Sequence, residues 1–285
     1  MSNSNNPTYS SVVETAREYY NSDDADNFYY HVWGGEDIHV GLYQSDEQPI
    51  RDASRLTVER MAEKLPGLGK DHKVLDVGGG YGGSMRYLAK HHGCQSVVLN
   101  ISEVENERDR QMNKEQGLDQ LVAVDDGDFE NLPYEDEAFD FVWSQDAILH
   151  SGNRERVLQE VARVLKPGGL FVMTDPMQDD NAPTDQLQPI YDRIHLESLG
   201  SPGFYKQAAE NNGLEFVEFE DHSHQLPRHY SRVRAELEKN EEELKSKNIV
   251  SDAYIQRMKK GLTHWVEGGN AGHLRWGIFA MRKPA

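Results

Sequence analysis

The feature that most constrains this 285-residue chain is a short apolar run that breaks into glycines, VLDVGGGYGG at residues 74–83. Glycines at this density let the backbone approach a ligand closely. The residues that follow predict a helix from about Gly83 to His92, and the N-terminus of a helix favours negative groups. A strand, a glycine turn and a helix in this order predict an α/β sheet with a ligand near the end of the first strand.

Further strands and helices are predicted to alternate after the glycine turn. The predicted strands are 73–78, 96–100, 121–124, 139–143 and 170–174. The predicted helices between them include 102–116, with Ser102 as its cap, and 153–166. Such alternation predicts a parallel sheet covered by helices on both faces.

The pattern changes on either side of this region. A helix is predicted over about 48–65, and the later segments are a helix at 201–212, a strand at 214–220, helices within 229–264 and a strand at 273–283. The 229–264 helices exceed what a minimal doubly wound sheet needs. We therefore expect four parts, namely an N-terminal aromatic lid (1–47), a ligand-binding core (48–222), a helical cap (223–270) and a final core strand (271–285).

The glycine run alone fits two kinds of ligand site. Gly78, Gly80 and Gly83 form the G-x-G-x-x-G of a dinucleotide site. Asp76, Gly78, Gly80 and Gly82 instead form a D-x-G-x-G-x-G run that resembles the motif of S-adenosylmethionine-dependent methyltransferases.

Three neighbouring segments favour the methyltransferase interpretation. Nicotinamide enzymes usually carry an acid at the end of the second strand, where this chain has Asn100. GDFENLP (127–133) places Asp128 where methyltransferases bind the adenine edge, and LKPGGLFVMTD (165–175) is similar to the segment that leads into their fifth strand. The resemblance implies a class I, Rossmann-like, seven-stranded and mostly parallel sheet, with S-adenosyl-L-methionine as the cofactor. The residues expected to bind it are Asp76, Gly78, Gly80, Gly82, Asn100, Asp128, Phe129 and Gln145.

Asn100 departs from the wider methyltransferase family, in which an acid usually binds the two ribose hydroxyls. An asparagine can still accept one such hydrogen bond and donate another.

The charge balance excludes some partners. Forty-nine acidic residues against thirty basic ones give a formal charge of −19, which argues against nucleic acid and other polyanions. Acidic excess also suits proteins that work in concentrated salt, where charges are screened over about 3 Å. Cys94 is the single cysteine, the N-terminal residues lack a signal-peptide pattern and no apolar run could span a bilayer, so we expect a cytoplasmic protein, as a monomer or a homodimer.

Four longer segments resemble the sarcosine/dimethylglycine N-methyltransferases, which make the compatible solute glycine betaine. These segments are 16–43, 97–102, 144–150 and 264–279, and the resemblance extends over nearly the whole chain. It implies that sarcosine and dimethylglycine are the substrates. SQDAILH (144–150) also resembles phosphoethanolamine N-methyltransferases, which keep a histidine at this place and a functional tyrosine near the N-terminus.

The proposed reaction indicates which side chains are needed. An amino-acid substrate must lose its ammonium proton before its nitrogen can attack, and His150 and Tyr20 are the candidates to take or hold that proton. A quaternary ammonium product suits an aromatic cage, and the N-terminal rings could supply one. The expected substrate residues are Tyr29, Trp33, Pro176, Met177, Tyr205 and Tyr230. Most rings of this segment, which also include Tyr30 and Tyr43, are expected simply to pack in the core.

The donor for the substrate carboxylate stays open at this stage. The candidates in the cap region are Tyr205, Lys206, Arg228, His229, Tyr230 and Arg232, and Arg193 after the fifth strand is another. No metal site is expected, because His91-His92 and His222-x-His224 lack further ligands at suitable spacing. The competing functions are N-methylation of phosphoethanolamine or another small amine, carbon methylation, and non-catalytic cofactor binding by a regulatory partner.

Overall fold

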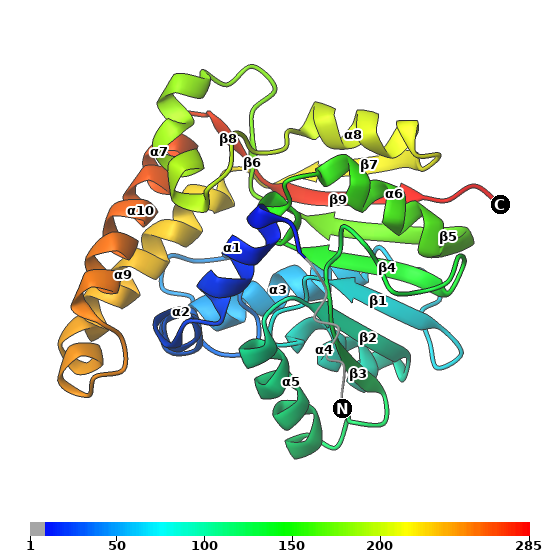
Figure 1. Cartoon of the computed structure of the whole chain (residues 1–285), viewed down its shortest axis with the longest axis horizontal. Helices are drawn as coiled ribbons and strands as arrows, with labels where there is room; N and C mark the ends of the chain where they lie inside the picture. The colour runs from blue at the N-terminus through cyan, green and yellow to red at the C-terminus, as the bar shows by residue number, and fades with distance from the viewer. Residues whose placement is uncertain (1–8) are drawn as a thin grey trace, which may run out of the picture.

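A seven-stranded sheet forms the centre of the protein, whose computed structural model describes residues 9–285 (Figure 1). Residues 1–8 of the predicted lid lie outside the described part. The strand order is β3-β2-β1-β4-β5-β9-β7, and only β9 runs antiparallel to its neighbours among these described strands. The strands are β1 (Lys73–Val77), β2 (Gln95–Asn100), β3 (Val122–Asp126), β4 (Phe139–Gln145), β5 (Leu165–Thr174), β7 (Glu215–Asp221) and β9 (Gly277–Arg282). This architecture confirms the predicted Rossmann-like sheet.

Helices cover both faces of the sheet and extend beyond its edge. They are α1 (Ser11–Tyr20), α2 (Asp23–Phe28), α3 (Ile50–Ala62), α4 (Gly83–His92), α5 (Glu103–Glu115), α6 (Arg154–Val164), α7 (Thr184–Ile194), α8 (Pro202–Asn211), α9 (Gln225–Ser246) and α10 (Asp252–Asn270). Two short turns, a π-helical one at Tyr29–Trp33 and a 3₁₀ one at Ile148–His150, contribute side chains to the site described below.

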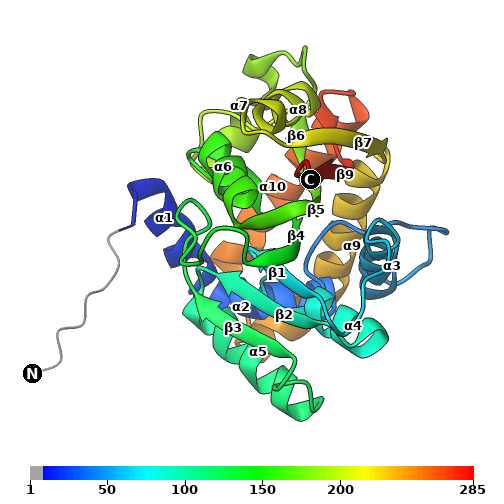
Figure 2. The ribbon, with the colours of Figure 1, turned by 90° about the vertical axis from the view of Figure 1, so that its right-hand side faces the viewer.

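The alternation of side chains along each strand divides the interior into two cores. In β1, Leu75 and Val77 face a core that includes α6 and α8, whereas Val74 faces a core that includes α3 and α4. Figure 2 shows α6 and α8 on one side of the sheet and α3 and α4 on the other. Both faces of the strands are buried, as expected for parallel strands with helical crossovers.

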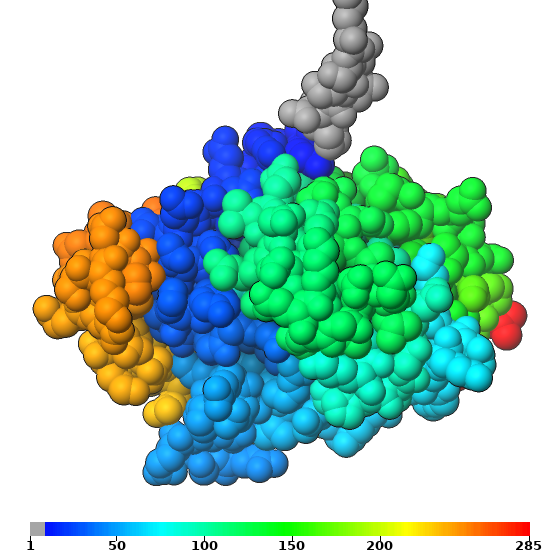
Figure 3. Space-filling view, turned by 90° about the horizontal axis from the view of Figure 1, so that it is seen from below, coloured from blue at the N-terminus to red at the C-terminus, as the bar shows by residue number. Residues whose placement is uncertain are grey.

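A helical cap lies beyond one end of the sheet. Helices α7, α9 and α10 stand together there, and the N-terminal segment lies between them and the strands (Figure 1). On the face seen in Figure 3, the N-terminal segment separates the α9–α10 pair from the core. Phe28 and Trp33 pack in a buried cluster with Val233, Leu237 and other residues of α9 and α10. Core packing therefore accounts for part of the aromatic content of this segment.

Two predictions for the second half of the chain are corrected. The predicted strand at 273–283 is two strands, β8 (Leu274–Arg275) and β9, because the chain changes sheets at Trp276. β8 pairs with β6 (Met177–Gln178), while β9 enters the main sheet. Helix α7 was not predicted, since Pro189 lies inside it and prolines usually end a helix.

Candidate active site

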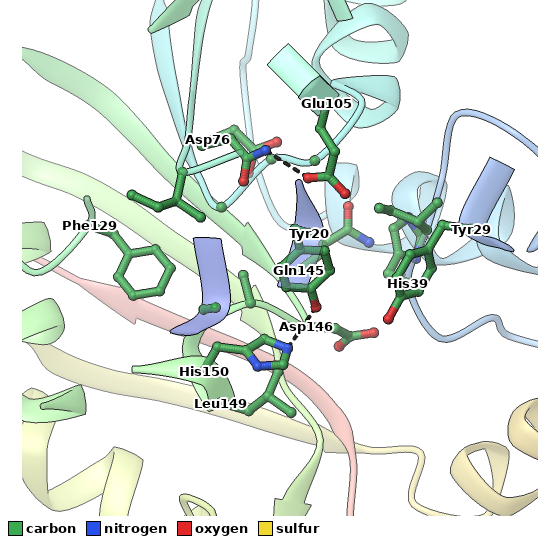
Figure 4. A pocket seen from close by; sticks show the side chains of 18 of the residues that line it. Tyr20, Tyr29, His39, Asp76, Glu105, Phe129, Gln145, Asp146, Leu149 and His150 are labelled. Carbon is green, nitrogen blue, oxygen red and sulfur yellow. Dashed lines mark hydrogen bonds between the residues drawn. The ribbon is translucent and has the colours of Figure 1, made fainter. Parts of the chain in front are cut away.

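The strand order reverses between β1 and β4, so the segments that follow these two strands diverge and leave a crevice. Open α/β sheets bind ligands at such a switch point. A cavity lies there, lined by residues that follow β1, β2, β3 and β4 and by residues of α1, α5 and the N-terminal segment (Figure 4). We call it the cofactor cavity, after the ligand expected from the sequence.

The glycine turn after β1 forms one wall of the cofactor cavity. Gly78, Gly80 and Gly82 have positive φ angles of 81°, 52° and 70°, which side chains with a Cβ rarely adopt. A Cβ on Gly78 would also lie 2.4 Å from the Cβ of Ala147, the second residue after β4. Only glycine therefore lets the two strand ends meet at this distance.

Seven of the eight residues expected to bind the cofactor line this cavity. They are Asp76, Gly78, Gly80, Asn100, Asp128, Phe129 and Gln145. Gly82 is not among the lining residues. It turns the chain into α4 and faces the carboxylate of Asp109, whose oxygens would lie 2.4 Å from an added Cβ.

Several buried polar atoms of the cavity have no partner within the protein. Gln145 Oε1 accepts hydrogen bonds from Ser84 Oγ (2.5 Å) and Trp143 Nε1 (2.9 Å), which leaves Gln145 Nε2 without an acceptor. Asp76 Oδ1 and Glu105 Oε1 are buried and equally without partners. Because buried polar groups are nearly always hydrogen-bonded, these atoms indicate that the cavity holds a polar ligand.

Glu105 was missed in the sequence, although it places a carboxyl beside Asn100 in the wall of the cofactor cavity. It lies in the first turn of α5, and its Oε2 accepts a hydrogen bond of 2.8 Å from Asn100 Nδ2. Burial raises the pKa of the Glu105 carboxyl to about 7. The sequence signal that could have found Glu105 is Ser102, the N-cap of α5. A helix that begins there has Glu105 in its first turn, beside the end of β2.

Tyr20 and His150, the two proposed catalytic residues, are brought together by elements far apart in the sequence. Tyr20 is the last residue of α1 and His150 ends the 3₁₀ turn after β4. Tyr20 Oη and His150 Nε2 share a hydrogen bond of 2.8 Å (Figure 4). Burial lowers the pKa of His150 to about 4 and raises that of Tyr20 well above its usual value. At neutral pH the pair therefore consists of an uncharged imidazole and an uncharged phenol.

A buried carboxylate holds the strand ends around this pair. Asp146 adopts a positive φ of 51°, and its two oxygens accept hydrogen bonds from the backbone N–H of Val40 (2.6 Å), Thr174 Oγ1 (2.8 Å) and the Trp276 indole (2.8 Å). It thus joins the N-terminal segment, β4, β5 and the start of β9. Asp146 was also missed in the sequence, where SQDAILH drew attention only to Gln145 and His150.

A second cavity of about 660 Å³ adjoins the cofactor cavity on the cap side. It lies between α1, α7 and α10, and we call it the substrate cavity. Seven residues line both cavities and so mark their junction; these are Ala16, Tyr20, Tyr29, Trp33, Leu149, His150 and Tyr230. The Tyr20 and Tyr29 rings stack with centroids 5.8 Å apart, and the Trp33 ring lies 5.3 Å from Tyr29. Three of the expected substrate residues, Tyr29, Trp33 and Tyr230, are therefore at this junction.

Of the other expected substrate residues, Pro176 lines only the cofactor cavity, and Met177 and Tyr205 line neither cavity. Met177 is fully buried in the core beneath α6 and α8 and does not line either cavity. Tyr205 is also fully buried, and its hydroxyl donates a 2.5 Å hydrogen bond to Asp175. Both side chains point into the core, so the prediction that they contact the substrate does not fit the structure.

Most candidates for binding the substrate carboxylate are also engaged outside the cavities. The Lys206 ammonium lies 5.3 Å from the centre of the Phe216 ring, and Arg228 binds the Tyr43 carbonyl. His229 Nδ1 accepts a hydrogen bond from the Gly41 N–H, and Arg232 lines neither cavity. Arg193, in contrast, lines the substrate cavity.

Residues 9–285 contain no cluster of three or more His, Cys, Asp or Glu side chains arranged to hold a metal ion. Within the same residues, no helix has both the length and the apolar composition needed to cross a membrane.

Comparison with known proteins identifies the class. Residues 75–173 match the family profile described as a methyltransferase domain, in agreement with the seven-stranded fold. The sarcosine/dimethylglycine N-methyltransferases of Halorhodospira halochloris and Aphanothece halophytica are 62% and 54% identical to the chain, over 95% and 96% of its length and 97% and 98% of theirs. A solved structure from Galdieria sulphuraria, provisionally described as a sarcosine dimethylglycine methyltransferase, is 45% identical, has a TM-score of 0.88, and covers 93% of this chain and 99% of its own. The chain belongs to the sarcosine/dimethylglycine N-methyltransferase family, as the sequence resemblance implied.

Proposed function

We propose that this protein transfers methyl groups from S-adenosylmethionine to the amine nitrogens of sarcosine and dimethylglycine, with glycine betaine as the last product. The observation that carries the proposal is the hydrogen bond between Tyr20 and His150 at the junction of the two cavities. The names of the relatives that match nearly the full chain support the choice of substrates.

The residues of the cofactor cavity fit the parts of S-adenosylmethionine, which supplies an electrophilic methyl group when bound. The unpartnered carboxylate oxygen of Glu105, with Asn100 beside it, suits the ribose hydroxyls. Asp128 suits the amino edge of adenine, and the Phe129 ring suits its face. The unpartnered oxygen of Asp76 suits the ammonium of the methionine part.

The reaction needs a neutral amine held in line with the methyl group. Sarcosine and dimethylglycine carry an extra proton on nitrogen in their zwitterionic forms, and this proton must leave before attack. The neutral imidazole of His150 has a lone pair available, and its hydrogen bond to Tyr20 connects that lone pair to the ring-lined junction. We infer that Tyr20 Oη orients the amine and that His150 receives the proton.

The rings at the junction suit the charge that methylation creates. Betaine carries a permanent positive charge that cannot donate hydrogen bonds, so aromatic faces are its natural partners. Each good cation–π contact contributes about 0.5–2 kcal/mol. Tyr20, Tyr29, Trp33 and Tyr230 are the rings that line both cavities. Tyr30 and Tyr43 line neither cavity, so we leave them out of the cage.

The proposal is tested by a methyl-transfer assay with S-adenosylmethionine and four acceptors, namely glycine, sarcosine, dimethylglycine and phosphoethanolamine, at low and high salt. We expect turnover of sarcosine and dimethylglycine that ends in betaine. Activity on phosphoethanolamine alone would overturn the substrate assignment. Tight cofactor binding without turnover of any amine would instead favour the regulatory partner.

A further inference from the structure

Arg193 is an inward-facing arginine that the proposed chemistry has not yet used. It lies in the last turn of α7, and its side chain reaches the substrate cavity against α10. Within residues 9–285 it forms no ion pair, and its Nη2 contacts the thioether sulfur of Met258 at 3.0 Å. A thioether is a weak acceptor, so the guanidinium retains most of its capacity to bind an anion.

Two other inward arginines of this chain have acidic partners, and a third, Arg154, donates instead to the carbonyls of Leu149 and Ser198. Arg86 binds Asp109 and Glu36, and Arg108 binds Asp26. The chain has forty-nine acidic residues, so carboxylates are abundant around its cations. Within residues 9–285, the Arg193 guanidinium has neither a carboxylate nor a carbonyl as a partner, which suits an arginine whose counter-charge arrives with a ligand.

A glycine in the middle of α10 makes room for this side chain. A Cβ on Gly261 would lie 2.5 Å from Arg193 Nη1 and 2.6 Å from its Cδ and Nε. Glycine weakens a helix interior compared with alanine, and the φ of Gly261 is not of the left-handed kind that would require glycine. The lower helix stability caused by Gly261 is explained if the Arg193 guanidinium must lie flat against α10 and face the substrate cavity.

The surroundings of Arg193 favour an anion of single charge. Arg257 and Lys260, the other cations of the α10 wall, are exposed, so Arg193 is the basic side chain that reaches inward. Tyr19 and Tyr254 nearby hydrogen-bond each other at 2.8 Å, and burial raises the pKa of the Tyr254 phenol well above its usual value. A single guanidinium matches a carboxylate through two parallel hydrogen bonds, whereas a phosphate dianion would leave charge uncompensated.

We propose that Arg193 binds the carboxylate of the amino-acid substrate and thereby points its amine toward Tyr20 and His150. This inference rests on the proposed function. The cavity that Arg193 lines also contains both residues of the pair, and its positive charge contributes to lowering the pKa of His150. Arg193 thus distinguishes amino acids from amines that lack a carboxylate.

The test compares Arg193→Gln and Arg193→Lys with the wild type. Loss of hydrogen bonds to a charged group should raise KM for sarcosine and dimethylglycine about 10- to 100-fold in Arg193→Gln, with a much smaller change in kcat. Arg193→Lys should recover part of the loss, because an ammonium keeps the charge but not the bidentate geometry. Arg234→Gln, which removes a cap arginine paired with Glu238 outside both cavities, is the matched control and should leave KM unchanged.

A second variant separates position from charge. Gly261→Ala keeps the guanidinium but displaces it, so KM should rise although the net charge and the fold are retained. Betaine titration provides a readout without turnover. The wild type should bind betaine in the presence of S-adenosylhomocysteine, and Arg193→Gln should lose this binding while its affinity for S-adenosylhomocysteine stays the same.

The outcomes separate the two proposals. A wild type that does not methylate sarcosine or dimethylglycine contradicts the proposed function. A wild type that methylates both, with unchanged KM and unchanged betaine affinity in Arg193→Gln and Gly261→Ala, contradicts the role of Arg193 alone. Lower kcat with unchanged KM in these variants would also overturn it.

Discussion

Single residues carry the chemistry of this site, and Tyr20 is the one whose role is easiest to isolate. Tyr20→Phe removes the hydroxyl that meets His150 and keeps the ring that stacks on Tyr29. We expect kcat for dimethylglycine to fall about 100-fold or more, the lower range for loss of proton-transfer catalysis, with little change in betaine affinity. Tyr87→Phe, on an outward tyrosine stacked on His91 and remote from both cavities, is the control. Equal losses of kcat and betaine affinity would mean that the hydroxyl serves binding instead.

We expect Glu105 to give cofactor binding a pH dependence near neutrality. Its pKa of about 7 is above that of an exposed glutamate, because burial disfavours the charged form. The ionised form accepts hydroxyl hydrogen bonds best, so affinity for S-adenosylmethionine should rise, by up to about tenfold, as the pH goes from 6 to 8. Calorimetric titration at several pH values measures this slope. In Glu105→Gln the slope should disappear, and an unchanged slope would assign the titration to another group.

The sequence predicted which residues line the cofactor cavity where one position has a single structural meaning. Asp76 lies near the end of a strand that can be recognised by its composition, and the glycines follow that strand. Prediction failed where the direction of a side chain decides the role. Met177 directly follows Pro176, and Tyr205 lies in the predicted helix 201–212, yet both side chains face the core. Glu105 was missed because it reaches the cavity from a helix, five residues beyond the strand end that was searched.

At the scale of elements, α1 acts as a cover that is attached at few points. Its residues Val13, Ala16 and Tyr20 line the cofactor cavity, while Arg17 and Asn21 both bind Glu103 at the start of α5. These contacts tie α1 to the N-terminus of α5, the helix that carries Glu105.

Glu103→Ala should loosen this attachment without harming the fold. The Glu103 side chain is 46% exposed, so its loss should cost at most about 1 kcal/mol of stability. We expect faster release of S-adenosylhomocysteine in stopped-flow experiments and a nearly unchanged melting temperature. Glu107→Ala, one turn further along α5 and 77% exposed, is the control. An equal effect of both variants would show that charge near α5, rather than the contact with α1, controls release.

The elements themselves were largely predictable in the first two thirds of the chain. The observed α4 runs from Gly83 to His92 as predicted, and the Ser102 hydroxyl accepts the N–H of Glu105 as a helix cap. Prediction became weaker beyond β5, because there the packing partners are distant in sequence. Nothing local shows that Trp276 leaves one sheet for another, since its indole is directed by Asp146.

At the scale of the whole molecule, buried carboxyl groups should make the ligand-free protein less stable as the pH rises. Burial raises the pKa of Asp175 to about 8 and that of Glu105 to about 7, and neither forms an ion pair within residues 9–285. Between about pH 6.5 and 8, where histidines are mostly neutral in both states, the folded state thus holds carboxyl protons that the unfolded state has released, so the free energy of unfolding falls with increasing pH. Melting temperatures at constant ionic strength between pH 6.5 and 8.5 test this. Asp175→Asn, which keeps an acceptor for Tyr205, should reduce the slope.

The net charge of −19 predicts that salt stabilises the molecule. Raising NaCl from 0.05 M to 1 M shortens the screening length to about 3 Å, which suppresses repulsion between distant acidic groups. Surface ion pairs weaken as well, but each contributes at most about 1 kcal/mol. We therefore expect a higher melting temperature at 1 M NaCl and the same rise with KCl. A fall in both salts would show that ion pairs, rather than repulsion, dominate the surface.

The position of β9 has a consequence for the order in which the chain is made. β9 lies between β5 and β7, although β7, α9 and α10 are all synthesised before it. While the ribosome is still translating α10, β7 has no neighbour with which to pair, and Trp276 is not yet available to Asp146. The nascent protein can therefore assemble β1 to β5 and the glycine turn early, but it gains a complete site only when its final strand leaves the exit tunnel.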